Sequence, residues 1–290
     1  MGELALSVAS GCGFDLGDFQ VSPSVLDPES HAYCLLELPW DCQDSCLTLE
    51  DVDGSTVMRF VNHAYNAGNI GFDYEGNHDA LARLGLIRAG GLTNAGALLF
   101  CNPGRILLTC ERIKDGTKGR TEEDAFLQTH APSAARRFGM ALGCPLADAP
   151  CQALIFIQST FGSFVDIWTR MRPEVLIRDG SGNQGSFRSQ MVPLGASWSG
   201  LPIKVQSRAV CSDVFSALVQ VFSQLDFGQS APVRLVATAR EVVIECDQRI
   251  WGLGGHVGQS RRTSPLVYRN PLIAETLMLL DGAKVGIRAA

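Results

Sequence analysis

The chain has 290 residues, of which 46% are hydrophobic and 19% are charged, and its formal net charge is −6 with a pI of about 5.4. This length and apolar content are enough for a packed core in one large or two modest domains. Because non-specific nucleic-acid binding depends on Lys and Arg side chains that neutralise phosphates, the acidic balance argues against direct DNA binding by the chain as a whole.

Residues 55–67 and 79–84 have the apolar periodicity of two helices, and Thr93 is placed to cap a third helix over 94–100, after a turn at Gly90-Gly91. Helix, turn and capped helix together are similar to a winged helix. The alternative, which we favour, is that this unit packs against a sheet elsewhere in the chain. The apolar residues that end the third helix must be buried, and few basic residues flank them.

The middle of the chain gives four weaker signals. Residues 105–113 are strand-like, and the composition of 121–142 predicts a helix. The apolar run at 153–157 predicts a buried strand, with a helix as the open alternative. The Gly- and Ser-rich stretch at 179–189 predicts a loop or the tip of a hairpin.

A third region, from Asp213 to Phe227, predicts an amphipathic helix that Asp213 and the serine before it can cap. The central apolar positions of this helix are Leu218, Val219 and Phe222. Two apolar-rich strands follow, at Pro232–Ala237 and Glu241–Cys246, joined by a short polar turn.

Membrane and metal signals are weak. No apolar run approaches the roughly 18 residues of a membrane-spanning helix, and the N-terminus lacks the basic start of a signal peptide, so we expect a cytoplasmic protein without membrane contact. Among ten cysteines, only Cys42 and Cys46 have a metal-like spacing, and no second close Cys or His pair completes a zinc site. We therefore predict no metal site.

Several segments, taken together, resemble one bacterial family. Phe215–Phe227 aligns without a gap to the family segment REALVNALVHRDY, and Leu84–Phe100 is close to LGLI-x-dG-x-LTNAGLLLFG. Arg269–Leu277 is close to RNPLIAEVL, while Leu38–Asp41 and Leu47–Asp53 are similar to a linker of the form sWD…tLeDLD. The family is that of the RecG-related transcriptional regulators.

The resemblance implies a domain plan. These regulators join an AlbA-like (Schlafen-type) DNA-binding module to an ATPase-like domain similar to those of gyrase, histidine kinases and MutL. On this basis residues 1–37 are expected to be the tail of a truncated AlbA-like module, 38–104 a helical, winged-helix-like linker, and 105–290 the ATPase-like domain. The expected fold class is α/β, with an α+β two-layer sandwich in the ATPase-like part.

The chain departs from the family where the chemistry lies. In active members the helix supplies a Glu that activates water and an Asn that binds Mg²⁺; the matching positions here are Ser216 and Gln220. A serine hydroxyl is no general base near neutral pH, and the Gln amide lies one methylene further out, which the strict geometry of Mg²⁺ tolerates poorly. His-Arg-Asp has become Gln224-Leu225-Asp226, so only the acid remains.

The next element departs in the same way. The family Asn-Pro-Gly after the second strand is Cys246-Asp247-Gln248 here, which removes a glycine that could approach a nucleotide. Asp179-Gly-Ser-Gly182 is similar to the D-x-G-x-G box of such ATPases, but it precedes the helix that the box should follow, so we discount it. The candidates for lining a nucleotide pocket are Gln220, Gln224, Asp226, Asp247, Gly252, Gly254, Gly255, Arg269 and Asn270.

Four hypotheses follow. The first is an ATPase-like regulator that does not hydrolyse ATP and acts through a protein partner, self-association or ligand sensing, with no confident catalytic residue or cofactor. The second is a functional enzyme that binds ATP and Mg²⁺ and uses Asp226, Glu241 or Glu245 as its acid. The third is a DNA-binding transcription factor, which the acidic charge disfavours. The fourth is a decayed fragment without a selected activity.

Overall fold

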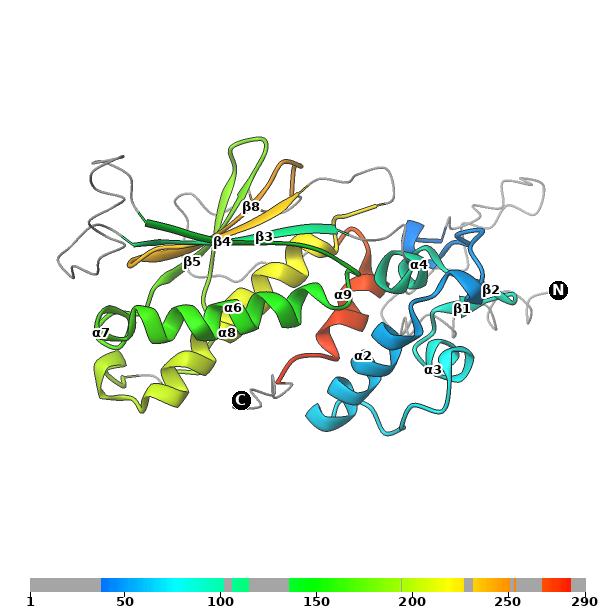
Figure 1. The fold of residues 1–290 in the computed structure, drawn as a ribbon, viewed down its shortest axis with the longest axis horizontal. Helices are drawn as coiled ribbons and strands as arrows, with labels where there is room; N and C mark the ends of the chain where they lie inside the picture. Colours follow the sequence, from blue (N-terminus) through cyan, green and yellow to red (C-terminus); the bar gives the residue numbers. More distant parts are fainter. Residues whose placement is uncertain are drawn as a thin grey trace, which may run out of the picture.

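The structure, a computed structural model, describes residues 38–101, 106–114, 136–193, 195–226, 232–250, 253 and 268–282, and for 114 and 136–141 it gives the backbone alone. This part of the chain is mixed α/β. A mixed sheet of six strands is covered on one face by long helices, and a smaller helical region lies at one end of the sheet (Figure 1). No helix of the described residues is long and apolar enough to span a membrane.

The sheet has the strand order β4-β3-β7-β8-β5-β6. Its β3–β7 and β5–β8 pairs are parallel and its other pairs antiparallel. The strands are β3 Ile106–Lys114, β4 Arg136–Cys144, β5 Glu174–Asp179, β6 Gln184–Phe187, β7 Val233–Ala237 and β8 Glu241–Cys246. The strands predicted over 105–113, 232–237 and 241–246 are confirmed, as is the hairpin tip within 179–189, which joins β5 to β6.

Side chains alternate between the two faces of the sheet. On β8, Val242 and Ile244 are fully buried in the main core, whereas Glu241 and Glu245 point to the opposite face. That opposite face carries ion pairs between neighbouring strands: Arg234–Glu111, Arg234–Glu245 and Arg178–Glu241. The face toward the helices is apolar, whereas the opposite face combines these ion pairs with three buried apolar residues outside the main core, Leu176, Val236 and Val243.

The helices that pack on the sheet correct two predictions. The apolar run at 153–157, predicted as a strand, lies within helix α6 (Ala149–Ser163), which has Pro150 in its first turn. Helix α8 (Ile203–Phe222) begins ten residues before the predicted start at Asp213. Its earlier turns continue the apolar stripe through Ala209 and Val210, both fully buried, so the periodicity extends beyond the segment that the resemblance covers.

A third correction concerns the predicted helix over 121–142. Residues 136–144 form β4, and 115–135 lie outside the described residues. All nine residues of β4 pair with β3, so the bonding of an adjacent strand outweighs the helix-forming composition. The sequence of β4 also alternates large apolar residues with small ones from Phe138 to Gly143, a period of two typical of a strand.

The N-terminal helical region follows the predictions closely. Its elements are the short helices η4 (Trp40–Cys42) and η5 (Leu49–Asp51), α2 (Gly54–Ala67), α3 (Asn77–Arg83), the hairpin of β1 (Ile87–Arg88) and β2 (Gly91–Leu92), and α4 (Asn94–Phe100). Thr93 caps α4 as predicted, because its hydroxyl accepts the N–H of Gly96 at 3.1 Å. Between β1 and β2, Ala89 and Gly90 both have positive φ, which is typical of a two-residue hairpin turn.

The helical region and the sheet share one core. Buried residues of α2, α4, α6, α8 and α9 (Pro271–Met278) belong to a single hydrophobic cluster. Hydrogen bonds join the ends of the described chain as well, since the amide of Asn69 after α2 donates to the carbonyls of Leu279 and Asp281, each at 2.8 Å. The helical unit therefore packs against α9 and the start of α6, whereas the alternative we favoured had it packing against the sheet.

Candidate functional site

The residues that the resemblance selects on α8 lie along its C-terminal turns. Gln220 is 2% exposed and Gln224, just past the end of the helix, is 1% exposed, while Ser216 is half-buried. Ser216 and Gln220 are four residues apart and therefore share one side of the helix. The end of α8 thus carries uncharged polar side chains at the positions where the family has its catalytic Glu and its Mg²⁺-binding Asn.

Arg269 and Asn270 complete this cluster from the segment before α9. The backbone N–H of Asn270 donates to the carbonyl of Ser223 at 2.9 Å, and its side-chain amide donates to the carbonyl of Leu225 at 2.7 Å. The guanidinium of Arg269 lies 3.2 Å from the carboxylate of Asp226. Asn270 therefore binds the carbonyls of two residues that lie just past the end of α8.

The structure thus brings together five of the candidate residues: Gln220, Gln224, Asp226, Arg269 and Asn270. Asp247 lies at the exposed exit of β8, against the turn that follows β5. Gly252, Gly254 and Gly255 lie outside the described residues.

A residue of the linker motif caps α9. Asp41 is fully buried, and its carboxylate accepts the backbone N–H groups of Leu272 and Ile273 at 2.6 and 3.2 Å. Burial raises the pKa of Asp41, and the two N–H groups oppose that rise. The carbonyl of the preceding Trp40 accepts the side-chain amide of Asn94, at the start of α4, at 2.7 Å. Three of the motifs that carry the resemblance therefore contact one another.

The carboxylate of Asp179 closes the turn after β5. It accepts the backbone N–H groups of Ser181, Asn183 and Ile250, at 2.8 to 3.0 Å, and the side-chain amide of Asn183 at 2.9 Å. Burial would raise the pKa of Asp179, but these hydrogen bonds outweigh it and hold the pKa below its usual value. Because the carboxylate is committed to the turn, Asp179 acts as a structural residue, in agreement with our discounting of this segment.

The only acid within α8 is Asp213, and the sequence did not reveal its role. Asp213 was predicted to cap the helix but lies in its middle, with only 1% of the residue exposed. Its carboxylate lies 2.5 Å from the guanidinium of Arg172. The backbone N–H of Ser189 also donates to this carboxylate, and the Arg172 guanidinium stacks 5.3 Å from the ring centre of Trp198. Burial raises the pKa of Asp213, while Ser189 and Arg172 act in the opposite direction. In the sequence, Asp213 lies among the apolar residues of the predicted helix, and this position was the signal that could have indicated a buried ion pair.

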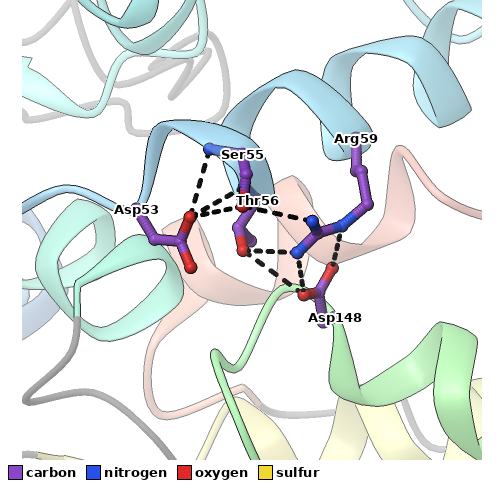
Figure 2. Close-up of polar contacts among 5 residues, drawn as sticks. All are labelled: Asp53, Ser55, Thr56, Arg59 and Asp148. Atoms are coloured by element: carbon purple, nitrogen blue, oxygen red, sulfur yellow. Dashed lines mark hydrogen bonds and ion pairs between the residues drawn. The ribbon is translucent and has the colours of Figure 1, made fainter.

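A second polar cluster joins α2 to the start of α6 (Figure 2). Arg59 lies 2.6 Å from the carboxylate of Asp148 and also donates to the hydroxyls of Ser55 and Thr56. Asp53 caps α2 by accepting the N–H groups of Ser55 and Thr56. Every polar group drawn in Figure 2 is engaged in capping or pairing, so the cluster serves as a bridge between the two parts of the protein.

The described residues at the end of α8 do not fit the Mg²⁺ ion that the resemblance implies. The turns of α8 beyond Asp213 contain no carboxylate, and the described residues contain no group of three or more His, Cys, Asp or Glu that could hold a metal ion. Glu241 and Glu245, the alternative acids of the second hypothesis, point to the sheet face away from α8 and pair with Arg178 and Arg234. Asp226 pairs with Arg269.

Comparisons with protein-family models, with curated proteins and with solved structures find no match to this chain. The family resemblance consequently rests on the short sequence motifs and on no overall similarity.

Proposed function

We propose that the chain is an ATPase-like regulatory protein that does not hydrolyse ATP and acts through protein interaction or ligand sensing. The observation that carries this proposal is the chemistry of α8. Ser216 stands at the general-base position, and the single acid of the helix, Asp213, is buried in an ion pair with Arg172. Neither group can take a proton from an attacking water at this site.

The arrangement of the layers supports the ATPase-like part of the proposal. A mixed sheet with long helices on one face is the architecture of an α+β two-layer sandwich, which the resemblance implies. Helix α8 is followed by the β7–β8 hairpin, an order that agrees with the helix and strand pair that the resemblance implies. Residues 54–100 form two helices, a hairpin and a third helix, and we assign this segment to the linker of the proposed domain plan.

The contacts between the motifs explain which part of the family pattern is kept. Asp41 caps α9, Asn270 caps the end of α8, and Asn94 holds the backbone of the linker. All three are scaffold contacts to backbone groups. The departures fall instead at Ser216 and Gln220, where the family has catalysis and metal binding. A kept scaffold with lost chemistry supports a binding role over turnover.

The regulatory part of the proposal comes from the RecG-related resemblance alone. With a net charge of −6, the chain as a whole repels phosphate, so we propose that a regulatory effect runs through a protein partner and not through direct contact with DNA. Sequence-specific retardation of DNA by the purified chain would contradict this.

The proposal is tested by measuring phosphate release from ATP, with and without Mg²⁺, for the wild-type chain and for Asp226→Asn. We expect no Mg²⁺-dependent release from either protein. Asp226→Asn is informative because Asp226 is the sole acid of the cluster at the end of α8. Release by the wild-type chain that Asp226→Asn abolishes, with unchanged melting behaviour, would establish the ATP-hydrolysing alternative instead.

A further inference from the structure

Among the residues that the structure describes, one edge of the sheet is open over a long strand. In the described part of the chain, β4 is the last strand of the sheet order and pairs through nine residues with β3, and no strand pairs with its outer side. The outer side of an edge strand presents a row of backbone N–H and C=O groups that a further strand can bind. The opposite edge is β6, which has only four residues.

The sequence of β4 lacks the usual protection of an edge. Natural edge strands are blunted by shortness, by proline or by charged side chains. β4 contains no proline, and residues 138–144 contain no charge. Its only charges are Arg136 and Arg137, at its beginning.

We propose that β4 pairs with β4 of a second copy of this chain, in antiparallel orientation, so that the two sheets become one continuous sheet. Overlap of all nine residues places Met140 on the two-fold axis, Phe138 opposite Leu142 and Arg137 opposite Gly143 of the second copy. The arginines of the two copies then lie at opposite ends of the pair, so like charges do not meet. The strand is therefore complementary to itself, as a two-fold interface requires.

The surface next to this edge supports a covered edge. Leu107 of β3, which pairs with Gly143, is 46% exposed. A Cβ atom added at Gly143 would meet nothing within 4 Å, so the leucine has open space beside it. A strand of a second copy laid along β4 brings side chains to this space. The pairing of the two strands follows from the strand order, the sequence of β4 and the surface beside it, and it does not depend on the proposed function.

Substitutions at Gly143 test the pairing through the sign of the charge. Gly143→Lys places a lysine opposite Arg137 of the second copy, and Gly143→Glu places a carboxylate there. Like charges opposite each other weaken a strand pair and unlike charges strengthen it, and the two-fold axis repeats the pair twice. Sedimentation velocity of the full chain should give a dimer whose Kd rises by about twofold to thirtyfold for Gly143→Lys and falls for Gly143→Glu.

A charge exchange provides the control. Adding Arg137→Glu to Gly143→Lys restores an attractive pair, so the double variant should dimerise at least as tightly as the wild type. The two single variants should melt like the wild type at a concentration where all are monomeric, because a side chain at position 143 has open space. A wild-type chain that stays monomeric at every concentration, or a dimer whose Kd is the same for Gly143→Lys and Gly143→Glu, would overturn the proposal.

Discussion

Asp41 and Asn270 show what individual buried polar residues do in this protein. Each directs its side chain at backbone groups of a remote segment, Asp41 at the start of α9 and Asn270 at the end of α8. Buried backbone groups without partners are costly, so these two side chains stabilise helix ends that meet inside the core.

Replacing Asp41 tests its capping role. Asp41→Ala removes the acceptor for the N–H groups of Leu272 and Ile273, so we expect the free energy of unfolding to fall by about 1–2 kcal/mol. Asp41→Asn is the matched control, since it keeps an oxygen acceptor without a buried charge. Urea denaturation measures both variants, and equal losses for Ala and Asn would show that the charge and not the cap is what matters.

The pH dependence of stability tests Asp179. Its pKa is lowered in the folded chain from an ordinary value of 3.8, so its stabilising effect is present above that value and is lost as the pH falls through the folded pKa. Asp179→Asn should cost about 1–3 kcal/mol at neutral pH, because it weakens hydrogen bonds to a charged acceptor. The difference from the wild type, followed by urea denaturation, should shrink below about pH 4. A constant difference down to about pH 2 would refute this role.

Among the elements, the long strands and helices with one clear period could be predicted from the sequence. Capping residues mark the starts of α2 and α4, and apolar residues recur along β7 and β8. Both signals can be found from residues that are close together in the sequence. β4 carries a similar alternation over residues 138–143, which the helix-forming composition of 121–142 concealed, and α6 has no single clear period. The bonds that fix β4 come from β3, and α6 is apolar on several sides because it packs against both the sheet and α8.

The turn between β5 and β6 gives a prediction at this scale. A Cβ at Gly180 would overlap the backbone carbonyl of Asp247 at the exit of β8, so Gly180→Ala should destabilise the protein by about 1–3 kcal/mol. Gly162→Ala in α6 is the control, because that Cβ meets nothing within 4 Å and a helix gains about 0.5–1 kcal/mol from the change. Thermal unfolding should shift in opposite directions, and a neutral Gly180→Ala would show that the turn can move away from β8.

For the candidate site, the resemblance supplied a set of residues, but the sequence did not predict which groups they contact. The resemblance selected Gln220, Gln224, Asp226, Arg269 and Asn270, which the fold brings together. The hydrogen bonds from Asn270 to α8 and the pairing of Asp213 with Arg172 join residues far apart in the chain, and local patterns carry no information on such contacts.

In the molecule as a whole, the first and last described segments are bound to each other. Asp41 caps α9, Asn69 binds the carbonyls after it, and Arg59 bridges α2 to Asp148 before α6. The Arg59 side chain is 47% exposed, so its ion pair adds little stability and the shared core holds the two parts together. The protein is therefore a firmly joined scaffold, which agrees with our proposal of an ATPase-like protein that binds without turnover.

The most direct test of the proposed loss of a Mg²⁺-dependent nucleotide site is a thermal-shift titration of the full chain with ATP and with a non-hydrolysable analogue, each with and without Mg²⁺. A functional site filled at about one hundred times its Kd would stabilise the fold by about 2.7 kcal/mol, a shift of several degrees. With Ser216 and Gln220 at the key positions, we predict a cooperative melt that Mg²⁺ does not shift further in the presence of nucleotide. A Mg²⁺-dependent rise of several degrees would show instead that the nucleotide site still functions.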